Sequence, residues 1–262
     1  MSGPPIFTPA YYERMRDLEA HGWWNAAMRD TLAAALGAAA LPEMGLLIDV
    51  GCGSGETLAW FASRRPKWRW IGIDLAWEGL RALPRMPRGR GIRASALALP
   101  AASSSADLVV CQDVLQHLPL NGGDLGALVE MRRVLKPGGL LFLRTNAQSV
   151  PRTDDDAEYN FHRYETRELR QKLVTAGFRI EVLGRVNALL GLAEIPRERR
   201  AICARGRGYH GLLSTTRRGS VRVARLKQRW LSLEGRLALL GWSLPLGRTH
   251  LAVCRVADGV GQ

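Results

Sequence analysis

Ten residues, 46–55, combine an apolar run with closely spaced glycines, a pattern suited to holding a ligand against bare backbone. The sequence LLIDVGCGSG places Gly51, Gly53 and Gly55 on alternate positions after Asp49. A short apolar run is typical of a buried parallel strand, and glycine tolerates the positive φ that a sharp strand-to-helix turn requires. Without side chains, such a turn leaves backbone N–H groups at a helix N-terminus open to a ligand. We therefore predict a strand, a ligand-binding turn and a helix.

The spacing of the glycines argues against a dinucleotide site. The dinucleotide fingerprint is G-x-G-x-x-G, with the pyrophosphate seated at the start of the helix. Here the third glycine comes one residue early, and Glu56 stands where the last glycine belongs. A carboxylate at that helix end repels a pyrophosphate but not a cation. A glycine-rich turn that binds nothing is the remaining alternative at this point.

A second predicted strand ends in an acid that suits a nucleoside. Residues 70–74 read WIGID, and Asp74 lies 19 residues after Gly55. A carboxylate at the end of the second strand of a βαβ unit can accept hydrogen bonds from both hydroxyls of a ribose. Leu75, which follows it, is suited to lie against an adenine face.

Two further motifs complete a series. Residues 106–118 (ADLVVCQDVLQHL) predict a strand and a following turn, and LKPGG at 135–139 predicts a helix stop and turn before the strand 140–145. In this order, the four motifs resemble the class I methyltransferases that use S-adenosylmethionine, over about residues 44–183. The resemblance implies an α/β fold: a seven-stranded, mostly parallel sheet with helices on both faces. Its last strand runs antiparallel between the fifth and the sixth.

The resemblance also implies a cofactor site, residue by residue. The loop residues Gly51, Cys52, Gly53 and Gly55 line the methionine and ribose, while Asp49 orders the loop. The remaining positions matched to S-adenosylmethionine are Asp74, Leu75, Ser95, Ala96, Leu97, Cys111, Gln112 and Arg29.

Three of these assignments need comment. Ser95 replaces an acid common in the family, so adenine contact is expected from the backbone of Ala96 and Leu97. Cys111 and Gln112 are expected to border the methionine moiety. Arg29 lies in a predicted helical lid, residues 1–40, together with Tyr11, Tyr12, Trp23 and Trp24, and is assigned to the cofactor carboxylate; core packing is the alternative for the tryptophans.

Methyl transfer to an O–H or protonated N–H group needs a base within hydrogen-bond reach. His117 and His162 are the catalytic candidates, with a purely structural role as the alternative, and His21 and His210 are further lid and cap candidates. We predict no metal site, because Asp154–Asp156 reads as an exposed acidic loop and the four cysteines show no zinc spacing. The sequence after the strand that ends at Cys111 is not the (D/N)PPY of amide and base N-methyltransferases.

The length and composition fit one catalytic domain with additional segments. The chain has 262 residues, 47% of them hydrophobic, and no apolar run approaches the roughly 18 residues of a membrane span. The first residues show neither a basic start nor an apolar h-region, so we expect no signal peptide and a reduced, cytoplasmic protein, with the inner membrane surface as a peripheral location. The oligomeric state is left open.

Positive charge is concentrated in one stretch. Residues 196–255 hold 14 Lys or Arg against two acids, whereas residues 1–195 hold 23 Lys or Arg against 21 acids. Because the sixth strand ends and the seventh begins at the carboxyl edge of the sheet, residues 184–248 are expected to form a cap beside the acceptor pocket. We divide the chain into the lid, a core at 41–183, this cap and a final strand and tail at 249–262.

An amphipathic basic helix is predicted within the cap. The apolar residues repeat at helical spacing, beside Arg222, Arg225, Arg229 and Arg236; they are Val223, Leu226, Trp230, Leu233, Leu237 and Leu240. Three interpretations stay open: a helix packed on the domain, a helix that meets an anionic membrane or a lipid-linked acceptor, and a nucleic-acid surface. The aromatics near the apolar stripe disfavour the last.

The function expected from all of this is methyl transfer from S-adenosylmethionine to O, N or C of a small metabolite or of a lipid- or sugar-linked acceptor. Two alternatives remain: an RNA methyltransferase that uses the basic cap, and a non-catalytic partner protein that binds the cofactor. A pocket filled by Tyr209 or Trp242 favours the latter.

Overall fold

The computed structural model describes residues 12, 16, 19, 21–119, 121–148, 162–191 and 220–257. Its centre is a seven-stranded sheet in the order β3-β2-β1-β4-β5-β7-β6. The strands are β1 (Leu46–Val50), β2 (Arg69–Asp74), β3 (Gly89–Arg93), β4 (Ala106–Gln112), β5 (Leu135–Asn146), β6 (Phe178–Val186) and β7 (Thr249–Val256). The helices are α2 (Trp23–Ala38), α3 (Glu56–Arg64), α4 (Trp77–Arg81), α5 (Gly123–Val134), α7 (Thr166–Thr175) and α9 (Val221–Leu239), with a 3-10 turn, η2, at Leu115–His117.

The topology confirms the predicted fold class. The strands β1 to β5 pair in parallel, and β7 runs antiparallel between β5 and β6. Thr249 at the start of β7 pairs with Asn146 at the end of β5 and with Val186 at the end of β6. The connection from β6 to β7 therefore leaves and re-enters the sheet at the carboxyl edge of the parallel strands, where open α/β sheets bind ligands.

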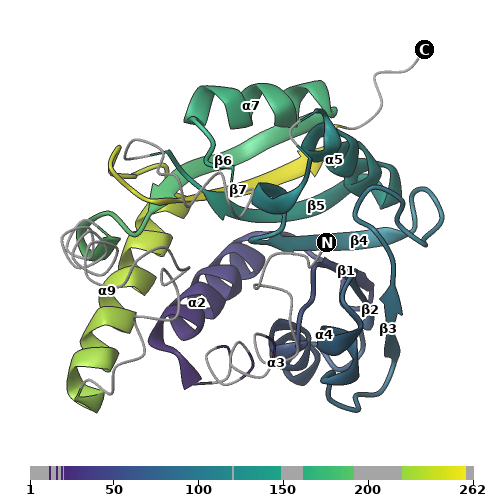
Figure 1. Cartoon of the computed structure of the whole chain (residues 1–262), viewed down its shortest axis with the longest axis horizontal. Helices are drawn as coiled ribbons and strands as arrows, with labels where there is room; N and C mark the ends of the chain where they lie inside the picture. Colours follow the sequence, from purple (N-terminus) through teal and green to yellow (C-terminus); the bar gives the residue numbers. More distant parts are fainter. Residues whose placement is uncertain are drawn as a thin grey trace, which may run out of the picture.

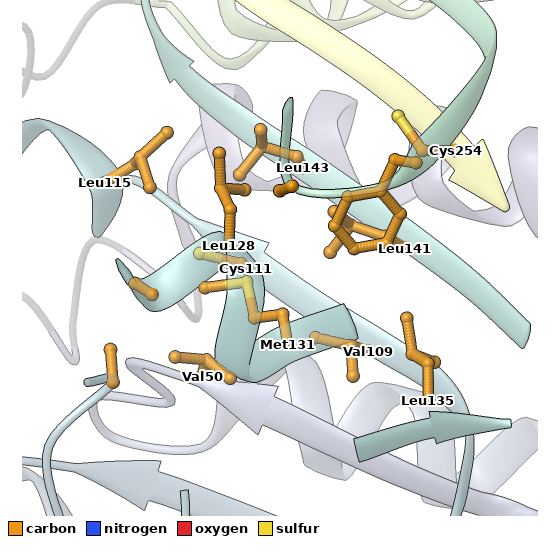
Figure 2. Close-up of a cluster of buried hydrophobic side chains, with 14 of the residues drawn as sticks. Val50, Val109, Cys111, Leu115, Leu128, Met131, Leu135, Leu141, Leu143 and Cys254 are labelled. Carbon is orange, nitrogen blue, oxygen red and sulfur yellow. The ribbon is translucent and has the colours of Figure 1, made fainter. Parts of the chain in front are cut away.

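Helices cover both faces of the sheet (Figure 1). One hydrophobic cluster packs α5 and α7 on one face, and a second packs α2, α3 and part of α9 on the other. Figure 2 shows the first cluster, in which Val109 and Cys111 of β4 meet Leu128 and Met131 of α5. Strands buried on both faces read as near-continuous apolar runs, which is why β1 and β4 are recognisable in the sequence.

Two local features differ from expectation. The edge strand β3 (GRGIR) was not predicted; four of its five residues are exposed, so it lacks a periodic apolar signal. LKPGG was predicted as a turn but forms the first part of β5, because Leu135 pairs with Ala106 at the start of β4. The turn-like character of this sequence is seen in a register shift in the pairing of β4 with β5 and in the positive φ of Gly138, 71°.

The packing of α9 differs from the simplest interpretation of its sequence. The apolar stripe Val223–Leu240 does not pack on the domain: its large side chains are exposed. The buried residues of the helix are instead Leu231, Ser232, Gly235 and Ala238, which face α2 and the sheet. A Cβ on Gly235 would lie 2.1 Å from Thr31 Oγ1 of α2, so glycine is required for the two helices to approach this closely.

Candidate active site

The glycine loop follows β1 and is pinned to the end of β2. The backbone N–H groups of Gly51 and Cys52 both donate to the carbonyl of Ile73, at 2.7 and 2.9 Å. Gly51, Gly53 and Gly55 all have positive φ, at 74°, 52° and 82°. Gly55 directly precedes α3, so the predicted sequence of strand, turn and helix is confirmed.

The three glycines are needed for different reasons. A Cβ on Gly51 would lie 2.0 Å from Val114 Cγ2, and one on Gly55 would lie 2.1 Å from Leu83 Cδ2. These two glycines therefore permit close packing of the protein itself. A Cβ on Gly53 would meet only the Glu19 carboxylate, at 3.5 Å. Protein packing does not require a missing side chain there, which makes Gly53 the position most open to a ligand.

Asp74 joins the loop to the end of β2. Its Oδ2 accepts a hydrogen bond from Gly53 N and its Oδ1 accepts one from Ala76 N, both at 2.9 Å. A carboxylate has about four acceptor sites, of which these two N–H groups and the backbone of Leu75 occupy three. The hydroxyl of Tyr12 also hydrogen-bonds to Asp74 in this conformation. Burial raises the pKa of Asp74, and these hydrogen bonds oppose that rise.

A cluster of buried acids surrounds the loop, and one of its members is unexpected. Glu19 from the N-terminal segment accepts a hydrogen bond from the Ser54 hydroxyl. Burial, followed by the nearby charge of Glu56, raises the pKa of Glu19. Asp49 lies wholly inside the protein, and burial together with Glu19 and Asp74 raises its pKa to about 8. A cationic ligand would stabilise the ionised form of these acids, so the cluster favours such a ligand over an anionic one.

The stretch after β3 lies next to the end of β2, since Ala94 N donates to the Asp74 carbonyl at 3.2 Å. The Ser95 hydroxyl accepts a hydrogen bond from Leu97 N at 3.1 Å and so closes a local turn. Ala96 is buried, whereas Leu97 and Leu75 are exposed at the same edge. The four residues assigned to adenine are thus close to Asp74.

The side chains of three other residues assigned to the cofactor make contacts within the protein. The side chain of Cys111 packs in the core, and burial raises its pKa, so its thiol does not line the sheet edge (Figure 2). Gln112 reaches Thr57 at the start of α3, with Nε2 and Oγ1 3.3 Å apart. Arg29 Nη1 donates to the backbone carbonyl of Glu19 at 2.7 Å. Arg29 therefore ties the N-terminal segment to α2 in this conformation.

Sequence reasoning missed an ion pair at the carboxyl ends of β4 and β5. Arg144 is buried and binds Asp113 through two hydrogen bonds, Nε to Oδ1 at 3.2 Å and Nη2 to Oδ2 at 2.5 Å. Asp113 holds φ at 58°, a conformation that is uncommon outside glycine and is enriched at functional sites. Asp113 lies in the predicted turn after Cys111, but its partner lies 31 residues away, so no local pattern links the two.

The two catalytic candidates lie on adjacent segments. His162 N donates to the carbonyl of Gln116, the neighbour of His117, at 2.9 Å. His162 Nε2 lies 2.8 Å from Glu168 Oε1, and its ring meets Tyr164 edge-on at 4.2 Å. His117 is largely buried, and this burial lowers its pKa to about 4. Its imidazole is therefore neutral at physiological pH.

Other sequence candidates are placed as follows. Trp23 and Trp24 pack against the second core cluster, in support of the packing interpretation, and His21 is exposed. Tyr11, Asp154–Asp156, Tyr209 and His210 lie outside the described residues. Within the described part of the chain, no group of three or more His, Cys, Asp or Glu could hold a metal ion. None of the described helices is long and apolar enough to cross a membrane.

Comparison with known proteins now assigns the domain. Residues 48–143 match the model of a family described as a methyltransferase domain. Residues 48–143 therefore form a methyltransferase domain, in agreement with the resemblance to class I S-adenosylmethionine-dependent methyltransferases. A trans-aconitate 2-methyltransferase from Azoarcus is 31% identical over 138 residues, which cover 52% of this chain and 49% of that protein. The chain spans about half the length of the curated relatives it matches.

Solved methyltransferases share the fold. A phosphoethanolamine N-methyltransferase from Haemonchus contortus superposes with a TM-score of 0.64 at 14% identity, over 97% of this chain and 58% of that one. A geranyl diphosphate C-methyltransferase from Streptomyces coelicolor gives 0.59 at 15%, over 98% and 86%. Both were solved with S-adenosylhomocysteine bound.

The residues of this methyltransferase domain fit S-adenosylmethionine. An added side chain at Gly53 would meet only Glu19, so this position is open to a ligand, and a ribose hydroxyl can replace the Tyr12 hydroxyl as a donor to Asp74. The buried carboxylates Glu19 and Asp49 suit a ligand with a cationic sulfonium. The same carboxylates, with Glu56, disfavour a pyrophosphate, in agreement with the glycine spacing.

Proposed function

We propose that this protein transfers a methyl group from S-adenosylmethionine to an O, N or C atom of a small metabolite or of a lipid- or sugar-linked acceptor. The observation that carries the proposal is the shared position of two groups of residues. The glycine loop with Asp74 lies at the carboxyl edge of the sheet, and so do Asp113, His117, Arg144 and His162. The proposed donor and acceptor sides therefore adjoin.

When bound, the cofactor supplies a methyl group on a positively charged sulfur, which is already activated for in-line displacement. The protein's own contribution is then mainly positioning and the exclusion of water. Gly53 and Asp74 hold the donor side, and the ion pair of buried Arg144 with partly exposed Asp113 provides a fixed polar group for the acceptor side. A pocket filled by Trp242 would favour a non-catalytic protein that binds the cofactor. Trp242 is 76% exposed, so it does not fill a pocket.

Small-molecule acceptors are supported by the similar proteins. The names of the Azoarcus and Streptomyces proteins give trans-aconitate and geranyl diphosphate as acceptors. The acceptor of the present protein is identified directly by incubating it with methyl-labelled S-adenosylmethionine and an extract of its native cell. We expect label in a small molecule or lipid. Label in the RNA fraction would favour the RNA alternative, and cofactor binding without any labelled product would favour the non-catalytic one.

We propose His117 and His162 as the bases for an acceptor that loses a proton. Replacing His162 with asparagine is expected to lower kcat at least about 100-fold, because a positioned base contributes about 10²–10⁴ to the rate. The measurement is kcat and KM across pH with the acceptor identified above. His21→Asn, at the exposed lid candidate, is measured in parallel, and a comparable loss there would assign the base to the lid instead. An unchanged kcat and pH profile in the His162 variant would leave this histidine a structural role only.

The pH dependence of the rate loss tests the role of His117. Because its pKa is lowered to about 4, His117 stays neutral throughout the pH range of most assays. A loss of rate in His117→Asn is therefore expected to be independent of pH above about 5. A loss that varies with pH between about 5 and 8 would contradict that assignment.

We further expect cofactor affinity to depend on pH through Asp49. A bound sulfonium favours the ionised carboxylate, and the pKa of Asp49 in the free protein is about 8. Binding then releases a proton, so affinity rises as pH increases from about 6 to about 9. The readout is the ratio of Kd for S-adenosylhomocysteine, which lacks the charge, to Kd for S-adenosylmethionine. The ratio should rise with pH in the native protein and stay flat in Asp49→Asn; a flat ratio in both would refute the role of Asp49.

A further inference from the structure

The surface of α9 reverses the usual arrangement of an amphipathic helix. Polar groups tie one side of the helix to α2: Ser232 Oγ and Gln228 Nε2 both donate to Asp30 Oδ2, at 2.8 and 3.2 Å. Lys227 Nζ lies 5.2 Å above the ring of Trp23. A surface helix normally buries its apolar stripe. Here Leu231 and the small or polar residues Ser232, Gly235 and Ala238 are buried, and the longer apolar stripe lies on another side.

We define the apolar face of α9 by six residues whose exposed fractions range from 41% to 76%: Val223, Leu226, Trp230, Leu233, Leu237 and Leu240. Trp242, Leu244 and Leu246, which follow the helix in the chain, are exposed as well. Contiguous exposed apolar residues on this scale mark an interaction site. Figure 1 shows α9 at the outer side of α2, with much of its length beyond the sheet.

The charges beside this face favour one kind of partner. Arg222, Arg225, Arg229 and Arg236 are all exposed and lie along one flank of the apolar face. The only acid in α9 is Glu234, which is held by Trp230 Nε1 at 2.8 Å and by Ala188 N at 3.1 Å. The face therefore presents tryptophan and leucine bordered by four cations, with no exposed acid.

We propose that the apolar face of α9 docks on an anionic lipid bilayer. An amphipathic helix with arginines at the polar boundary and tryptophan and leucine on the apolar side lies in the plane of a membrane interface. The arginine heads can then contact lipid phosphates while their aliphatic stems follow the apolar surface. Two copies of the chain that met through this face would add eight arginines to one interface, which disfavours a dimer.

The proposal is tested by co-sedimentation of the full chain with vesicles, without cofactor or acceptor. We expect binding to vesicles of phosphatidylglycerol and phosphatidylcholine, and much weaker binding to phosphatidylcholine alone. Replacing Leu226, Leu233 and Leu237 together with serine should weaken binding at least about 10-fold, and so should replacing Arg222, Arg225 and Arg229 with glutamine. These side chains are exposed, so both variants should keep the native melting temperature.

A matched control removes equal charge elsewhere. Arg69, Arg85 and Arg90 are exposed near β2 and β3, at the opposite end of the sheet from β6 and β7, and their triple replacement by glutamine should leave vesicle binding unchanged. The proposal is overturned if the native chain stays in the supernatant, if this control weakens binding as much as the α9 variants, or if the leucine variant dissociates a dimer instead. Because the assay needs no methyl transfer, its result is independent of the proposed function.

Discussion

Replacing Asp74 with alanine is expected to weaken the binding of S-adenosylmethionine at least about 10-fold, because it removes a charge-assisted hydrogen bond from the site. Two losses combine in this variant. The carboxylate no longer accepts from the ribose hydroxyls, and Gly53 N, which it holds at 2.9 Å, is released. Isothermal titration calorimetry measures the change directly.

The neighbouring acid Glu78 provides the control. It lies in the first turn of α4, close to Asp74 in the chain but outside the glycine loop. Glu78→Ala should therefore bind the cofactor with nearly native affinity, which excludes a general effect of lost negative charge. If Asp74→Ala folds normally and its Kd is also unchanged, the assignment of the cofactor site to this edge of the sheet is wrong.

Replacing Gly51 with alanine is expected to destabilise the fold by about 2–5 kcal/mol, the sum of a left-handed backbone cost and overpacking. Gly51 has φ 74°, and an added Cβ would lie 2.0 Å from Val114 Cγ2. Val114 belongs to the segment between β4 and η2, so the clash would push the glycine loop and this segment apart at the carboxyl edge of the sheet. Denaturant unfolding monitored by circular dichroism gives the free energy.

A second glycine separates the two contributions. Gly241 also has a positive φ, 88°, but an added Cβ there would have nothing within 4 Å. Gly241→Ala should therefore show only the backbone cost, about 1–2 kcal/mol. Equal destabilisation by the two variants would mean that Val114 moves aside at no cost, and the tight packing of the loop would then have no energetic role.

Much of the fold could be predicted because its signals are local. The apolar runs of β1 and β4 are buried on both faces, and the glycine loop requires its glycines through backbone conformation and close packing. The exposed edge strand β3 could not be predicted, since pairing with β2 and not its own pattern makes it a strand. LKPGG was misjudged for the same reason: the partner strand extends β5 through a turn-like sequence.

The candidate site also combines residues that the sequence indicates with contacts that only the tertiary structure forms. The loop glycines and Asp74 could be proposed from sequence because they lie within one βαβ unit of fixed geometry, and the structure brings them together. Glu19 beside Ser54, Tyr12 on Asp74 and the Arg144–Asp113 pair join segments far apart in the chain, so no local pattern announced them. The raised pKa of Asp49 likewise depends on the assembled cluster, because it results from the burial of Asp49 and from the charges of Glu19 and Asp74.

The sequence by itself determined the donor side of this protein: the order of motifs and the glycine spacing specify a methyltransferase domain and its cofactor. It also located the positive charge and the periodicity of α9. Only the tertiary structure decided which face of that helix is buried. Periodicity records which residues share a face, but the face that packs depends on the partner surface: Thr31 of α2 requires a glycine opposite it, and Asp30 requires a hydrogen-bond donor.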